Sequence, residues 1–125
     1  MKRTYKELTE YAQSIADDIT RRRKTQPIKI VVRELYRGHA HIESRFVSVP
    51  TSAYYLENLE YFTYYTIHEI THLIANTIKH NADFKRVERH ELKLWGLDIE
   101  YRRAYPSKLI ANGQVCYENK RKGEK

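Results

Sequence analysis

The sequence predicts an α+β fold, in which a helix and a small three-stranded sheet precede a long helix, a following helix and a C-terminal hairpin. Three observations support this prediction. Apolar residues recur at helical spacing near the N-terminus and again over residues 51–78. Between these regions, short runs rich in β-branched residues are interrupted by Gly38 and Pro50. The length of 125 residues suits one domain, so we expect residues 1–125 to form a single unit.

The first element is expected to be an amphipathic helix over residues 4–24. Thr4 and Glu7 have the spacing of a capping box, and Pro27 follows the expected end of the helix. Apolar side chains recur every three or four positions, which places them on one helix face. The residues of that face are Leu8, Tyr11, Ala12, Ile15 and Ile19.

Three strands are expected to follow the first helix. Residues 28–35 (IKIVVREL) are rich in β-branched side chains and should form a buried strand. Residues 38–42 (GHAHI) and 45–49 (RFVSV) should form two shorter strands, the second of which is ended by Pro50. The strand of residues 38–42 should lie at the sheet edge, where an extended peptide could add as a further strand.

The second half of the chain predicts two helices and a hairpin. A long helix should begin within residues 51–58 and carry apolar residues as far as Ile78. In residues 109–117 (LIANGQVCY), Asn112-Gly113 predicts a type I′ hairpin. Residues 98–125 would form a tail that could fold across a cleft and hold it closed. The helix between them should start near Asn81 or Asp83 and end at Gly96, with an inward face of Phe84, Val87, Leu94 and Trp95.

The composition limits the cellular setting and the partners. The net charge is +7, from 23 basic and 16 acidic residues, which either attracts a polyanion such as DNA or serves solubility. The basic residues cluster in residues 21–24, 85–86 and 120–122. The single Cys116 excludes an internal disulfide, and we find neither a secretory signal nor a membrane-spanning run. We therefore expect a cytoplasmic protein.

The most informative segment is His68-Glu69-Ile70-Thr71-His72, which lies inside the long helical pattern. Histidines four positions apart lie one helical turn apart, so both imidazoles can reach one ion at about 2.0–2.1 Å. Glu69 points elsewhere, where it could contact a water on the open side of that ion. The spacing predicts a zinc site with His68 and His72 as ligands and Glu69 as a general base.

A catalytic zinc site needs a third protein ligand. His80 is the first candidate, but on a continuous helix it would lie about 12 Å beyond His72 along the axis. The helix must therefore end before His80 and the chain must turn back. Lys79 suits the last helical turn, and Asn81 suits a left-handed stop or a cap. Glu88, Glu91 and His90 on the following helix are the competing candidates, and a site without a third ligand also stays open.

The segment HEITHLIANTIKHNADFK resembles the SprT-like and YgjP-like zinc metallopeptidases. The resemblance implies a zincin-like fold, a Zn²⁺ cofactor held by His68, His72 and His80, and Glu69 as general base. It also implies that Phe84 packs behind the third ligand. Asn81 stands where glycine is common, and no zinc ribbon accompanies Cys116. The small size is also similar to that of the minigluzincins, whose third ligand is a glutamate, so that Glu88 and Glu91 remain alternatives.

These observations predict a zinc metalloendopeptidase that acts on protein or peptide substrates. Zinc would lower the pKa of a bound water, and Glu69 would accept its proton during attack on the peptide carbonyl. Tyr101 or Tyr105 could stabilise the resulting oxyanion. Two other functions remain open: a basic nucleic-acid-associated domain with a structural or inactive zinc site, and a zinc hydrolase acting on a non-peptide bond.

Overall fold

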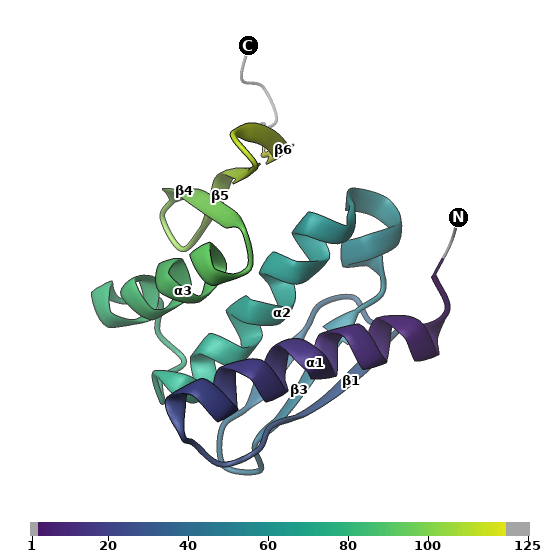
Figure 1. Cartoon of the computed structure of the whole chain (residues 1–125), viewed down its shortest axis with the longest axis vertical. Helices are drawn as coiled ribbons and strands as arrows, with labels where there is room; N and C mark the ends of the chain where they lie inside the picture. Colours follow the sequence, from purple (N-terminus) through teal and green to yellow (C-terminus); the bar gives the residue numbers. More distant parts are fainter. Residues whose placement is uncertain (1–2, 120–125) are drawn as a thin grey trace.

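The computed structural model describes residues 3–119, which have the expected α+β architecture (Figure 1). The long helix α2 runs through the middle, with α1 and the first sheet on one side and α3 with the second sheet on the other (Figure 1). The core therefore has two parts that share α2. No helix of the described residues is both long and apolar enough to span a membrane.

Helix α1 (Tyr5–Arg23) confirms the predicted first element. Thr4 and Glu7 form the capping box, each side chain bonding the other residue's backbone N–H at 3.1 and 2.9 Å. Lys24 ends the helix in the left-handed conformation, with φ of 56°. The hydroxyl oxygen of Tyr11 lies 2.6 Å from Oγ1 of Thr63, which ties α1 to α2. The fully buried face consists of Leu8, Ala12, Ile15, Ala16 and Ile19.

The first sheet contains β1 (Lys29–Arg33), β2 (His39–His41) and β3 (Phe46–Pro50) in the order β1-β3-β2. β3 runs parallel to β1 and antiparallel to β2. The three predicted strands are confirmed, although β1 is shorter than residues 28–35. β2 is an edge strand, because its only strand partner among the described residues is β3. This placement leaves one side of β2 free beside α2.

The helical region that follows begins within residues 51–58, as predicted, but in two pieces. The π-helical η1 (Ala53–Glu57) precedes α2 (Leu59–Ile74). Asn58 is extended between them, and its Oδ1 accepts a hydrogen bond from the Tyr61 N–H at 2.7 Å. The expectation for Ile78 is wrong, because α2 ends at Ile74 and the Ile78 side chain is 78% exposed.

Helix α3 (Ala82–Leu94) begins after Asn81, whose side chain accepts from the Phe84 N–H at 2.9 Å. Asn81 is thus the cap, and Asp83 lies in the first turn. The prediction that Leu94 faces inward is wrong: it is 55% exposed, because Leu92 occupies the inward position of that turn. Gly96, with φ of +81°, follows the end of the helix. The buried residues of α3 are Phe84, Val87, Glu88, Glu91 and Leu92.

The second sheet is antiparallel and contains β4 (Leu97–Arg102), β5 (Tyr105–Ala111) and β6 (Gln114–Glu118) in that order. The predicted hairpin joins β5 to β6, and Asn112 and Gly113 at its turn have positive φ values of 54° and 77°. β4 was not expected, although Leu97 and Ile99 alternate with polar residues and are buried. The predicted basic cluster of residues 120–122 lies outside the described residues.

Candidate metal centre

His68 and His72 lie one turn apart on the buried face of α2. Their side chains are almost completely enclosed, and their ring centroids are 5.2 Å apart with the planes nearly perpendicular. Ile67, which precedes them, and Ile70, which lies between them, are buried in the hydrophobic core and fix the helix there. The same amphipathic pattern that makes α2 helical therefore presents both imidazoles to one point.

The chain turns back immediately after α2, as a third ligand at His80 requires. Ala75 caps the helix, and Asn76 adopts the left-handed conformation with φ of 54°. The Thr77 N–H then donates to the His72 carbonyl oxygen at 3.1 Å. The prediction of a bend is confirmed, and Asn81 takes the second of its two predicted roles, as the cap of the next helix. The left-handed turn is made by Asn76 instead of Asn81, and the prediction that Lys79 lies in the last helical turn is wrong.

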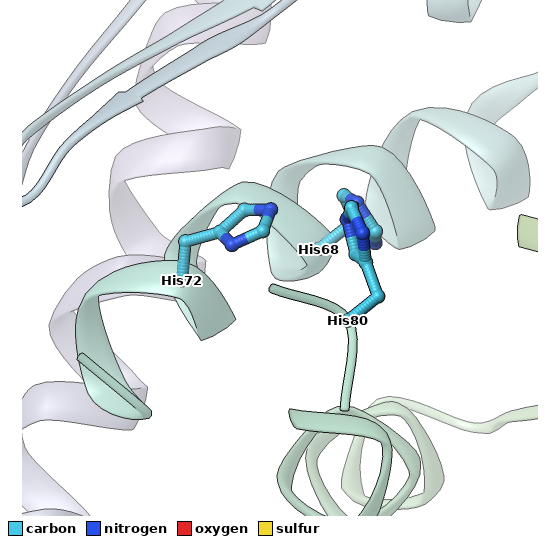
Figure 2. A group of neighbouring side chains, drawn as sticks. All are labelled: His68, His72 and His80. Carbon is cyan, nitrogen blue, oxygen red and sulfur yellow. The ribbon is translucent and has the colours of Figure 1, made fainter. Parts of the chain in front are cut away.

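The bend brings His80 beside the two helical histidines, and the three rings converge (Figure 2). One nitrogen from each ring can be chosen so that all three lie within 4.8 Å of one another. Nε2 of His80 is 3.2 Å from Nε2 of His68. Two ligands of a tetrahedral ion with bonds near 2.0–2.1 Å lie about 3.3 Å apart, so this pair already has the separation that zinc requires.

The rings of His68 and His72 are held in the tautomer that a metal needs. Nδ1 of His68 lies 2.6 Å from Oε2 of Glu88, and Nδ1 of His72 lies 2.8 Å from the carbonyl oxygen of Thr77. Because both partners are acceptors, each Nδ1 carries the proton and donates it. In a neutral ring, a proton on Nδ1 leaves the lone pair of Nε2 for a metal ion.

Phe84 supports the three rings from behind. It is fully buried, and its ring centroid is 4.6 Å from that of His72, 4.9 Å from that of His80 and 5.1 Å from that of His68. The resemblance implied this packing. Its consequence is an apolar wall that excludes water from one side of the donor set.

Burial also lowers the pKa of two of these imidazoles. The pKa of His80 falls to about 4, first through burial and then through the neighbouring His68 and His72. Burial likewise lowers the pKa of His72, although its hydrogen bond to Thr77 acts in the opposite direction. Both rings are therefore neutral near pH 7, as metal ligands must be.

The competing ligand candidates lie elsewhere. Glu88 is occupied by His68 on one oxygen and by the Tyr101 hydroxyl, at 2.6 Å, on the other. Glu91 is 1% exposed and forms ion pairs with Arg22 and Arg23, each at 2.6 Å. His90 is exposed on α3. Among the described residues, the group able to hold a metal ion contains His68, His72 and His80 and none of these three.

Glu69 lies beside the cluster and lines the same cleft as the three histidines. Its side chain is buried, and this burial raises its pKa to about 7, with the Glu88 carboxylate acting in the same direction and His68 opposing it. A carboxylate with a pKa near 7 can both accept and return a proton at neutral pH.

The cleft has a volume of about 660 Å³ and reaches from the edge strand to the second sheet. Gly38, His39 and Ala40 line it on the β2 side, and Tyr105 lines it from β5. The Tyr105 ring centroid is 5.5 Å from that of His80 and 5.8 Å from that of His68. The predicted tail thus contributes one residue to the cleft.

Sequence reasoning missed the link from His68 through Glu88 to Tyr101. Glu88 was considered only as a ligand and Tyr101 only as an oxyanion donor. The signal available was the position of Glu88 one turn after Phe84 on the inward face of α3, where a carboxylate must find partners. The structure makes this link the support of the first imidazole.

Comparisons with known proteins add the following. No protein-family model matches the chain, and no curated protein matches its sequence. Among solved structures, the fold is similar to the crystal structure of the metallopeptidase zymogen abylysin of Pyrococcus abyssi, at 24% identity with a TM-score of 0.48. The similarity covers 74% of this chain and 89% of that chain. At this level it supports no conclusion about activity, and the resemblance to SprT-like and YgjP-like peptidases stays a prediction from the motif.

Proposed function

We propose that the chain is a zinc-dependent peptidase. The observation that carries the proposal is the convergence of His68, His72 and His80 on one point, with Glu69 beside it in an open cleft. Three imidazole nitrogen donors suit a zinc ion that keeps one position free for water or substrate. When bound, zinc would polarise the scissile carbonyl and make the water acidic enough to lose a proton near pH 7.

Three residues of the chain would carry out the other parts of the reaction. Glu69 would accept the proton from the attacking water as the new carbon–oxygen bond forms, and would return it to the amine nitrogen as the carbon–nitrogen bond breaks. Tyr105, which lines the cleft from β5, would donate its hydroxyl proton in a hydrogen bond to the oxyanion. Glu88 would hold His68 in its orientation throughout.

The edge strand β2 supports a peptide as the substrate. Its free side borders the cleft through His39 and Ala40. An extended peptide could add to this edge as a further strand, which would fix its backbone across the cluster through main-chain hydrogen bonds. A small non-peptide substrate would leave these donors and acceptors unused.

The direct test compares the wild type with Glu69→Gln and His68→Ala. We expect purified wild type to contain one zinc per chain and to cleave a mixture of unfolded proteins, with new N-termini identified by mass spectrometry. Glu69→Gln should keep the zinc and lose at least a thousandfold in rate, while His68→Ala should lose both. Cleavage by Glu69→Gln at the wild-type rate would exclude the role of Glu69.

A second candidate function is binding of DNA by the outer face of α3. Five basic side chains recur there at three- and four-residue spacing and line a groove of about 500 Å³. Arg86 pairs with the exposed Asp83, whereas Arg22 and Arg23 on α1 are already paired with buried Glu91. The groove residues are Lys85, Arg86, Arg89, His90 and Lys93.

Salt dependence would test this second function. A duplex should bind more weakly by at least tenfold between 50 and 200 mM salt, because each phosphate contact releases counterions. Replacing Lys85, Arg89 and Lys93 by Glu should abolish this binding. An equal change of net charge elsewhere should reduce it less, and the matched control replaces Lys6, Lys29 and Lys108 by Glu. Equal losses in the two triple variants would contradict a site on α3.

A further inference from the structure

The cleft contains an aromatic wall that the proposed chemistry does not use. Tyr61, Tyr64 and Tyr65 lie in the two turns of α2 before His68, and all three line the cleft. Their ring centroids are 5.5, 6.1 and 6.5 Å apart, so they form one continuous surface. Tyr64 is buried and forms its floor, whereas Tyr61 and Tyr65 are partly exposed.

This aromatic wall is held in place from two sides. The Tyr65 hydroxyl oxygen accepts a hydrogen bond from the Gly38 N–H at 2.9 Å, which fixes its ring against the edge strand. The Tyr61 ring packs on Tyr117 of β6 with centroids 4.5 Å apart. Because both rings are fixed before any ligand arrives, a side chain that packs on them loses little affinity to ordering of the protein.

Large apolar side chains are also exposed at the rim of the cleft. Ile78, in the loop between α2 and α3, is 78% exposed, and Tyr105 of β5 is 56% exposed. Both line the same cleft as the aromatic wall. Exposed apolar surface that borders a cleft gains free energy when an apolar ligand covers it. The rim and the wall therefore favour the same kind of side chain.

The charge of the cleft adds a second preference. Arg37, next to Gly38 in the chain, is the one lysine or arginine among the lining residues. Glu69 also lines the cleft near Gly38, but in a Glu69→Gln protein a basic substrate side chain at this end would meet only a like charge and an apolar surface. A lysine in the substrate should therefore be a poorer match than an apolar residue of similar length.

We propose that the cleft selects extended peptides that carry a large apolar or aromatic side chain, which packs against Tyr61 and Tyr65 on the side of the cleft that Tyr105 also lines. This inference rests on the proposed peptidase function and adds its substrate class. Its physical content is a complementary surface beside the metal centre, so it can be measured as binding without any cleavage.

The test uses the zinc-loaded Glu69→Gln protein and labelled peptides of one host sequence made of Gly, Ser and Thr. A single central residue is Phe, Leu, Ala or Lys, and binding is followed by fluorescence anisotropy. We expect the Phe and Leu peptides to bind at least tenfold more tightly than the Ala and Lys peptides. Equal affinity for all four, or no measurable binding of any, would overturn the proposal.

A substitution at the rim of the cleft would show whether the preference for an apolar side chain arises there. Tyr105→Ser should weaken the Phe peptide about fivefold and leave the Ala peptide unchanged. The matched control is Leu56→Ser in η1, which removes an 80% exposed apolar side chain that does not line the cleft. The same loss in Leu56→Ser would overturn the assignment to this cleft.

Cleavage by the wild type separates the two proposals. Selective binding of the Phe peptide without cleavage of any peptide would refute the peptidase and leave the apolar site standing. Cleavage of all four peptides at equal kcat/KM would support the peptidase and refute the apolar site.

Discussion

The carboxylate of Glu88 lies 2.6 Å from Nδ1 of His68, although the two residues are 20 positions apart and belong to different helices. Glu88 is fully buried and its second oxygen accepts from Tyr101 on β4. A buried carboxylate is stable only where its lone pairs are used and a positive charge is near. A cation bound at Nε2 of His68 would supply that charge, so the second sheet and α3 together support the metal centre.

Glu88→Gln should weaken zinc binding about tenfold to a hundredfold. Glutamine keeps the volume and one acceptor but removes the charge that makes the imidazole a stronger donor. Competition with a chromophoric chelator measures the zinc affinity of each variant. Glu100→Gln, an exposed change on neighbouring β4, is the control and should leave the affinity unchanged. Equal affinities in both variants would show that Glu88 does not support the site.

Glu91→Ala should lower the free energy of unfolding by about 1–3 kcal/mol, because Arg23 loses its carboxylate partner and Arg22 keeps only Asp18. Asp83→Ala removes the exposed pair with Arg86 and should cost about 0.5 kcal/mol or less. Urea denaturation measures both. Zinc affinity per folded chain should stay unchanged in Glu91→Ala, and a loss there would restore Glu91 as a ligand candidate.

Most of the elements could be predicted because they carry a local signal, whereas β4 was not expected. The capping box of Thr4 and Glu7 and the turn of Asn112-Gly113 specify their elements without reference to distant residues. The positions of Ile78 and Leu94 could not be predicted in the same way. Ile78 continues the apolar spacing of α2, but the left-handed Asn76 ends the helix first. Apolar spacing shows over which residues a helix is possible, but it does not show at which residue the helix ends.

The same distinction between local and long-range signals applies to the candidate site. The spacing of His68 and His72, with the need for a bend before His80, was readable because it follows from helix geometry alone. The pairing of Glu88 with His68 and Tyr101 depends on how α3 and β4 pack against α2. That packing brings together three segments whose separation in the chain leaves no periodic pattern. Ionic partners such as Glu91 and Arg22 were hidden for the same reason.

Gly38→Ala should destabilise the protein by about 1–3 kcal/mol and displace the edge strand. A Cβ at this position would lie 2.6 Å from Cε1 of Tyr65 and 2.8 Å from the Ser48 carbonyl oxygen, so strand or ring must move. Urea denaturation would measure the loss of stability. Peptide affinity in a Glu69→Gln background would show whether the shape of the cleft has changed.

Gly113→Ala is the matched control for Gly38→Ala. A Cβ at position 113 would meet nothing within 4 Å, so the loss of stability comes from the φ of +77° alone. It should therefore lower stability without changing peptide binding. If Gly38→Ala binds peptides as well as Gly113→Ala does, the edge strand does not shape the cleft.

Protonation of His80 should destabilise the metal-free protein as the pH falls from about 6.5 towards 4. Burial lowers the pKa of His80 to about 4, below the value of about 6.5 that an unfolded chain has. Between these values the unfolded state binds the extra proton, so stability is present above pH 6.5 and is lost on acidification. Glu69 acts in the opposite sense, because its raised pKa makes the folded state the better proton binder below pH 7.

The Glu69→Gln background therefore isolates the histidine effect. In the presence of chelator, the urea midpoint of Glu69→Gln should fall more steeply between pH 7 and 5 than that of Glu69→Gln with His80→Asn. His90→Asn, an exposed change on α3, should leave the steep dependence in place. Identical slopes with and without His80 would mean that this ring is solvated like that of an unfolded chain. It could then not belong to a preformed, partly buried metal centre.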